Sequence, residues 1–134
     1  MAREVINPDD MYNAVEYGFS HAVAHSGGKT IECSGQVAWD DERNLVGEGD
    51  LTAQTAKCFD NLKRVLAHAG AAPADVVRMR MYVVGHTADK LGIIGPAIAE
   101  FFGDDLPAAN TLVGVNALAL PGFLIEVEVT AVVN

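Results

Sequence analysis

The segment from Asp50 to Gly70 constrains the fold of this chain most strongly, because it predicts one long amphipathic helix. Asp50 is a suitable N-cap, and Gly70 is the residue type that commonly ends a helix. Apolar and small residues recur between them at helical spacing and form a single stripe: Leu51, Thr55, Cys58, Phe59, Leu62, Val65, Leu66 and Ala69. A helix with one apolar stripe needs a second layer of structure to cover that stripe.

Strand-like segments are available to form the second layer. Their apolar and β-branched residues and the turn residues between them predict strands over 19–24, 29–38, 76–84, 110–117 and 123–133. The first two are separated by the turn-forming sequence His25-Ser26-Gly27-Gly28, so we expect them to pair as a hairpin.

A second, shorter helix is expected before Gly103. Its apolar face carries Leu91, Ile94, Ile98, Phe101 and Phe102. Because a proline deep inside a helix costs about 3 kcal/mol, Pro96 predicts that this helix begins near Gly95 or is kinked there. The order β-β-α-β-α-β-β, with no repeat or linker, predicts one α+β domain over residues 1–134, with both helices on one face of a mixed sheet.

Alternation along the strands assigns each side chain to one face of the sheet. The helix-facing sets are Ile31, Cys33 and Gly35, then Val77, Met79, Met81 and Val83, then Ile125, Val127, Val129 and Ala131. If the strands are neighbours, the other face gathers Glu32, Arg78, Arg80, Tyr82, Glu126 and Glu128. One interpretation of such a face is a charged surface exposed to solvent. The other is a polar interface or cleft, in which the carboxyl groups in excess of the arginines have a raised pKa. The sequence leaves both interpretations open.

Charge and composition exclude several classes of function. Nine Lys and Arg against eighteen Asp and Glu give a net charge of −9, which disfavours binding to nucleic acid. No stretch approaches the roughly 20 apolar residues that a membrane helix needs. The first residues lack the apolar core of a secretory signal, so we expect a cytoplasmic protein with no membrane partner.

The cysteines and histidines do not predict a metal or cofactor site. Cys33 and Cys58 lie outside any CxxC motif and are expected to be buried free thiols. His21 and His25 have a spacing that suits metal binding on a helix, but on a strand they would be about 13 Å apart. We therefore expect neither a metal nor a cofactor.

Several short motifs follow one another in an order typical of one protein family. They are Phe19-Ser20-His21-Ala22-Val23, Ser34-Gly35-Gln36, Gln54 with Asn61-Leu62, Phe101-Phe102 with Pro107-Ala108, Leu112-Val113-Gly114-Val115 and Leu124-Ile125-Glu126-Val127-Glu128. Through these motifs and their order, the chain resembles the RidA/YjgF family over nearly its whole length. The resemblance implies a chorismate-mutase-like fold assembled as a homotrimer, with the sheets inside and ligand clefts between subunits.

The resemblance also implies an activity, the hydrolysis of reactive imines and enamines to a keto acid and ammonia. In the family an arginine holds the substrate carboxylate and a glutamate helps to place the attacking water. Glu126 matches the glutamate and Ser34 the signature serine. The tyrosine of the first strand falls on Phe19, while Tyr17 lies two residues away on the same predicted strand face.

The arginine is the point at which this chain departs from the family. Its position falls on Asn110, or on Ala109 after a one-residue slip, and neither residue is cationic. Arg78 and Arg80 are the candidates to replace it if either reaches the cleft.

Three functions are compatible with these residues. The first is a hydrolase or deaminase for a small imine, enamine or related C–N compound that is less acidic than the family's usual substrate. Glu126 would position water, and Asn110 with Ser34 would orient the substrate. The second is a non-catalytic trimer that binds a small metabolite, which the missing arginine favours. The third, cleavage of RNA as reported for some relatives, is disfavoured by the charge of −9.

Overall fold

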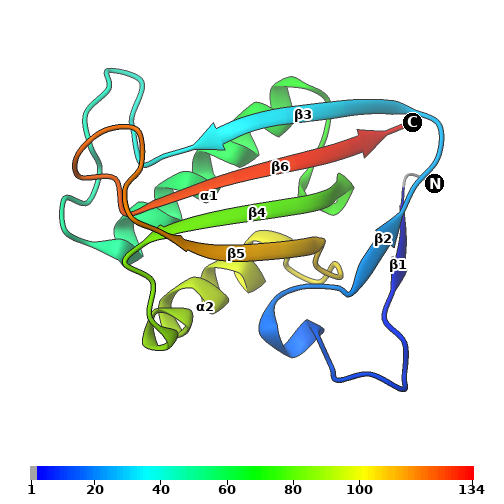
Figure 1. Ribbon diagram of the computed structural model, residues 1–134. Helices are drawn as coiled ribbons and strands as arrows, with labels where there is room; N and C mark the ends of the chain where they lie inside the picture. The colour runs from blue at the N-terminus through cyan, green and yellow to red at the C-terminus, as the bar shows by residue number, and fades with distance from the viewer. Residues whose placement is uncertain (1–2) are drawn as a thin grey trace.

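The computed structural model describes residues 3–134, which form a two-layer α+β domain. One layer is a four-stranded mixed sheet in the order β3-β6-β4-β5, with β3 at Lys29–Gln36, β6 at Ile125–Val133, β4 at Val76–Val84 and β5 at Ala109–Val115. The strands β4 and β5 are parallel, and β6 is antiparallel to both of its neighbours. Two helices, α1 and α2, lie on one face of this sheet and leave the other face open (Figure 1). The predicted fold class is confirmed.

The long helix α1 spans Leu51–His68, as the sequence predicts. The Asp50 side chain accepts a hydrogen bond from the Ala53 N–H at 3.1 Å, which satisfies one of the free donors of the first turn. The buried face of the helix includes Cys58, Leu62 and Leu66, each fully shielded from solvent. This face packs against β6 and β3, so the helix fixes the position of the strand that carries Glu126.

The helix α2 spans Leu91–Phe102 and continues through Pro96. Of the two alternatives predicted for Pro96, the start near Gly95 is therefore wrong, and the kink stays a prediction. One face of the helix buries the large side chains of Ile94, Ile98, Phe101 and Phe102. Burial of each such side chain is worth about 1.5–3 kcal/mol, which together exceeds the cost of about 3 kcal/mol for one proline. Gly103 follows the last helical residue, as expected.

The predicted hairpin between residues 19–24 and 29–38 is also wrong. The first of these segments contributes only a short strand, β2 at Ala22–Ala24, which pairs with β1 at Glu4–Ile6 in a separate two-stranded sheet. The strand β3 pairs instead with the C-terminal strand β6, from Lys29 opposite Val133 onward. A turn sequence can bring two strands near each other, but β6 offers β3 a longer buried partner, which the turn sequence does not reveal.

The core lies between the sheet and the two helices. The residues predicted to face the helices from β6 and from most of β4 are buried there, including Met79, Met81, Ile125 and Val127, which are fully shielded. At the start of β4 the register shifts, so Val76, and not Val77 as predicted, joins this core opposite Ala131. Cys33 and Cys58 are buried free thiols. The pKa of Cys58 is raised to about 12, first by burial and then by the charge of Glu126, so this thiol is inert at neutral pH.

Candidate functional site

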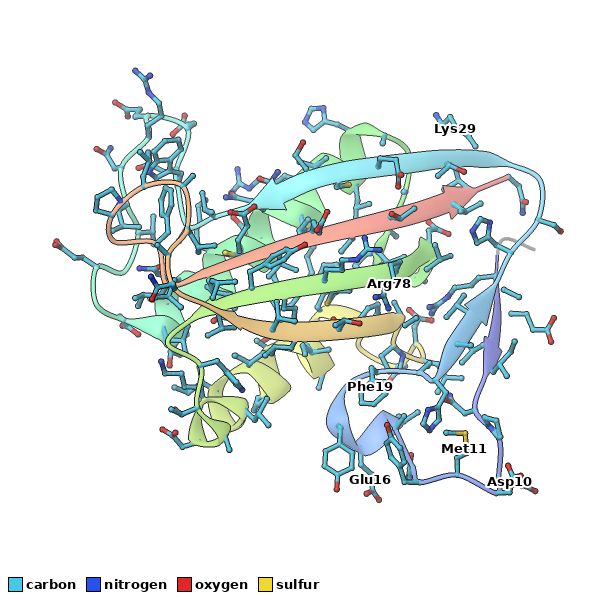
Figure 2. All side chains as sticks on the ribbon, in the orientation of Figure 1. Asp10, Met11, Glu16, Phe19, Lys29 and Arg78 are labelled. Atoms are coloured by element: carbon cyan, nitrogen blue, oxygen red, sulfur yellow. The ribbon has the colours of Figure 1, made fainter. Side chains whose placement is uncertain are left out.

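The face of the sheet that the helices do not cover gathers the predicted charged residues; Figure 2 draws its side chains. Cross-strand pairing sets Glu126 opposite Tyr82, Glu128 opposite Arg80, and Thr130 opposite Arg78. We call this surface the open sheet face and define it by Glu32, Arg78, Arg80, Tyr82, Glu126 and Glu128.

Most polar groups of the open sheet face have partners on neighbouring strands. The Tyr82 hydroxyl donates to the Glu128 carboxylate, and the Thr130 hydroxyl donates to Glu32 Oε1 at 2.6 Å. Arg78 donates from Nη2 to Thr111 Oγ1 at 2.8 Å. The side chains of Glu126 and Arg80, in contrast, have no hydrogen-bond partner among residues 3–134. Glu126 is the carboxylate of this face that is left available for a ligand.

Glu126 lies over a bulge in the neighbouring strand. Between Cys33 and Gln36 the ladder of β3 shifts by one residue, so that Ser34 and Gly35 together oppose the single residue Glu128. The bulge turns Gly35 toward the open sheet face, and the expectation that it faces the helices is wrong. A Cβ at Gly35 would lie 2.7 Å from Cδ of Glu126, so only glycine leaves room for this carboxylate.

The surroundings of Glu126 favour its neutral form. Burial raises the pKa of this carboxyl above its ordinary value, and the negative charge of nearby Glu128 raises it further. A carboxyl group with a raised pKa exchanges protons more readily near neutral pH, which suits a general acid or base. Ser34 is exposed in the adjacent bulge, and its carbonyl accepts a hydrogen bond from Gln36 Nε2 at 3.3 Å.

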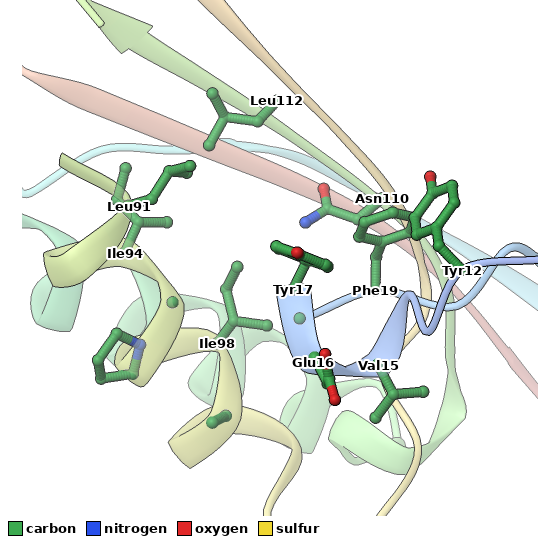
Figure 3. Close-up of a pocket in the computed structure, with 14 residues that line it drawn as sticks. Tyr12, Val15, Glu16, Tyr17, Phe19, Leu91, Ile94, Ile98, Asn110 and Leu112 are labelled. Atoms are coloured by element: carbon green, nitrogen blue, oxygen red, sulfur yellow. The ribbon is translucent and has the colours of Figure 1, made fainter. Parts of the chain in front are cut away.

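A pocket of about 920 Å³ lies elsewhere in the domain, between the N-terminal segment, α2 and β5 (Figure 3). We call it the β5/α2 pocket. Its lining residues are Tyr12, Val15, Glu16, Tyr17, Gly18, Phe19, Leu91, Ile94, Gly95, Pro96, Ile98, Ala99, Asn110 and Leu112. Tyr12, Val15 and Glu16 were not predicted to belong to a site, because these residues precede the first expected strand and show no periodicity.

The N-terminal wall of this pocket is held against the start of β5. Ser20 forms an isolated bridge with Ala109, and its hydroxyl donates to the Pro107 carbonyl at 2.5 Å. These contacts bring Phe19 and Tyr17 beside Asn110, as Figure 3 shows. Tyr17 lies in a short 3-10 helix at Val15–Tyr17 and Phe19 precedes β2, so the predicted common strand face is wrong although both residues line one pocket.

Asn110 and Glu126 lie on opposite faces of the sheet. Asn110 is paired in register with Met79, whose side chain faces the helices, and its Nδ2 donates to Met81 Sδ at 3.6 Å. Its Oδ1 is buried without a hydrogen-bond partner in the described part of the chain. Within one chain, therefore, Asn110 does not share a cleft with Glu126 and Ser34.

The predicted site residues accordingly fall into two groups. Tyr17, Phe19 and Asn110 line the β5/α2 pocket. Glu126, Ser34, Arg78 and Arg80 belong to the other side of the sheet. Arg78 and Arg80 precede and follow Met79, which faces the helices, so neither places a guanidinium in the pocket of its own chain.

The described residues form neither a metal-ligand cluster nor a membrane-spanning helix. In the range 3–134 no three His, Cys, Asp or Glu side chains are grouped so that they could hold a metal ion. His21 is occupied by a contact of 2.9 Å from Nε2 to the Tyr12 carbonyl. No helix in this range is long and apolar enough to cross a membrane.

Comparison with solved structures supports the same architecture. The Rid-family protein YyfB of Yersinia pestis, described as of unknown function, is 53% identical, with a TM-score of 0.97 over 99% of this chain and all of its own. The YjgF/YER057c/UK114-family protein Rv2704 of Mycobacterium tuberculosis is 30% identical, with a TM-score of 0.64 over 98% of this chain and all of its own.

Comparison by sequence gives relatives of similar length. The protein DfrA of Myxococcus xanthus is 31% identical over 98% of this chain and 97% of its own. A 2-iminobutanoate/2-iminopropanoate deaminase of Dermatophagoides farinae is 30% identical over 68% of this chain and 69% of its own. The family model described as Endoribonuclease L-PSP matches residues 11–133. The chain therefore belongs to the RidA/YjgF family.

Proposed function

We propose that this protein hydrolyses a small imine or enamine in a cleft between the subunits of a homotrimer. The β5/α2 pocket of one subunit would hold the substrate, and Glu126 of its neighbour would act on water. The observation that carries the proposal is the free carboxylate of Glu126, which has a raised pKa and lies over the Gly35 bulge. The relative named as an imine deaminase supports the reaction class.

The need for two subunits follows from the positions of Asn110 and Glu126. The pocket contains a hydrogen-bonding amide but no described group suited to abstract a proton from water, because its carboxylate, Glu16, is exposed at the surface. Glu126 is suited to that role but lies across the sheet. A closed ring of identical subunits places the same two surfaces against each other at every interface, so each cleft would be complete.

The reaction at such a cleft needs one water molecule and no other reactant. An enamine first takes a proton on carbon to become the imine. Glu126 accepts a proton from water as the water oxygen attacks the imine carbon. The electron pair of the C=N π bond moves onto nitrogen, which takes up a proton from solvent to give a carbinolamine. Glu126 then returns its proton to the nitrogen, and the C–N bond breaks as the hydroxyl releases its proton to solvent, which gives a carbonyl compound and ammonia.

A non-catalytic metabolite-binding trimer is the second candidate. The pocket lacks the cation that would hold a carboxylate, and a charge-assisted hydrogen bond of this kind contributes about 1.5–3 kcal/mol. Its loss lowers affinity for a carboxylated imine at least about tenfold. Cleavage of RNA, although it is the activity in the family model's description, is opposed by the net charge of −9.

The deciding experiment measures ammonia release from imines generated in situ from several amino acids and amines. Wild type is compared with Glu126→Gln, and with Glu32→Gln as a matched control on the same face of the sheet. We expect Glu126→Gln to lose at least about 100-fold in rate, as removal of a general acid-base group does, and Glu32→Gln to keep its rate. Equal rates for all three proteins would contradict the enzyme, and saturable binding without turnover would favour the metabolite binder.

A further inference from the structure

The β5/α2 pocket has no positive charge with which to hold an anion. None of its lining residues is Lys, Arg or His, and its one carboxylate, Glu16, offers an anion no favourable contact. The nearby Lys90 is not available, because its Nζ donates to the Val84 and Gly85 carbonyls at 3.3 and 2.8 Å. A carboxylate that entered this pocket would lose its water and gain no ion pair from the residues of the same subunit.

Asn110 gives the pocket a specific hydrogen-bonding requirement. Its Oδ1 is an acceptor that is buried and unpaired in residues 3–134, whereas buried polar side-chain atoms in proteins nearly always have a partner. One N–H of the same amide is engaged only by the weak acceptor Met81 Sδ. Oδ1 is shielded from solvent in this conformation, so a ligand N–H group would satisfy it once the amide turns Oδ1 toward the pocket.

The remaining walls are apolar and disfavour a charged ligand of either sign. Ile94 and Ile98 of α2 and Leu112 of β5 supply aliphatic surface, and Phe19 and Tyr17 supply aromatic surface. Glu16 is exposed to water, so its carboxylate is hydrated and gives little compensation to a buried ammonium group. The pocket thus resembles a small-molecule site that is mostly apolar with a few placed polar groups.

We infer that the β5/α2 pocket binds an uncharged, largely apolar ligand whose N–H group donates to Asn110 Oδ1. This inference rests on the proposed function only for the chemistry that follows binding. As a substrate, the ligand would be an imine or enamine without a carboxylate, formed by oxidation of an amine rather than of an amino acid. Asn110 is then the residue that determines specificity against anions.

Binding of three compounds of nearly equal shape tests the inference. Calorimetry on the full-length protein compares phenylacetamide, phenylacetate and 2-phenylethylammonium. We expect the amide to bind at least about tenfold more tightly than either ion, because it alone is uncharged and presents an N–H group. Tightest binding by phenylacetate or by the ammonium ion would overturn the inference, as would failure of the amide to bind at all.

Variants of Asn110 test the role of the amide. Asn110→Leu should weaken phenylacetamide binding at least about fivefold, and Asn110→Arg should reverse the preference toward phenylacetate. Asn116→Leu makes the same change in the exposed loop after β5 and should leave binding unaltered. Unchanged amide binding by Asn110→Leu would overturn the assignment. A wild type that binds the amide but hydrolyses no imine would contradict only the proposed function.

Discussion

Gly35 of β3 lies directly beneath the side chain of Glu126 of β6. The carboxylate of Glu126 occupies the space into which a side chain at residue 35 would project, with Cδ 2.7 Å from the position of a Cβ. The bulge at Ser34 and Gly35 creates this arrangement by turning the glycine toward the open sheet face. The glycine of the Ser-Gly-Gln sequence therefore has a steric role in this chain, because it leaves space for the Glu126 carboxylate.

Gly35→Ala should displace the Glu126 carboxylate and lower imine hydrolysis at least about tenfold, since a misplaced catalytic group loses activity steeply. Steady-state rates of ammonia release would measure the loss. Gly92→Ala is the control, because a Cβ there meets nothing within 4 Å and the residue is helical. That change should keep the activity and raise stability by up to about 1 kcal/mol. Full activity in Gly35→Ala would show that the position of Glu126 does not matter.

The raised pKa of Glu126 predicts a pH dependence of stability. The folded protein holds this proton more tightly than the unfolded chain does, whose carboxyl has the ordinary value of 4.5. The unfolding free energy contributed by the group is therefore complete below pH 4.5 and is lost as the pH rises through the folded-state pKa. Glu126→Gln should unfold at a higher temperature than wild type at pH 7, and the difference should shrink at pH 4. A variant that is less stable than wild type at pH 7 would contradict the sign of this shift.

Gln54 links α1 to the loop that contains Gly47 and to the loop that precedes β6. Its fully buried amide donates to the Gly47 and Gly122 carbonyls at 3.0 and 2.9 Å and accepts from the Leu124 N–H at 2.9 Å. Gln54→Met keeps the volume but leaves the Gly122 carbonyl and the Leu124 N–H unpaired, whereas the Gly47 carbonyl still accepts from the Asp50 N–H. Unfolding in urea should therefore show a loss of at least about 2 kcal/mol. Lys57→Met on the outer part of the same helix, where the residue's ion pair with Asp60 is partly exposed, should cost less than about 1 kcal/mol. Similar losses in both variants would mean that the buried network adds no stability.

Much of the fold follows from periodicity. The helical stripe after Asp50 and the alternation along 76–84 and 125–133 each continue over several turns or residues. Many residues therefore indicate the same buried face of each element. The hairpin expected at Gly27-Gly28 depended on a turn alone, and strand pairing is decided by partners distant in the sequence. A helix start near Gly95, one of the two alternatives predicted from Pro96, is wrong. The proline penalty can be read from the local sequence, whereas the burial that offsets it depends on tertiary packing.

The candidate site was harder to predict than the fold. The resemblance to the family identified Glu126, Asn110 and Phe19, but not that the sheet separates the first from the other two. Alternation assigns faces within each strand, and a bulge reverses that assignment at Gly35 without a signal in the spacing. The pocket wall at Tyr12 comes from a segment without periodicity, which only the contacts around Ser20 bring into place.

The proposed trimer predicts that the open sheet face is buried between subunits. Light scattering should give a mass near that of three chains of 14.2 kDa. Arg80 pairs in register with Glu128, and Arg80→Glu would add a fourth acid to Glu32, Glu126 and Glu128, so subunit affinity should fall at least about tenfold. Arg43→Glu makes the same charge change in an exposed loop and should leave the mass unaltered. A monomeric wild type at micromolar concentration would remove the intersubunit cleft from the mechanism, because Asn110 and Glu126 could then not meet one ligand.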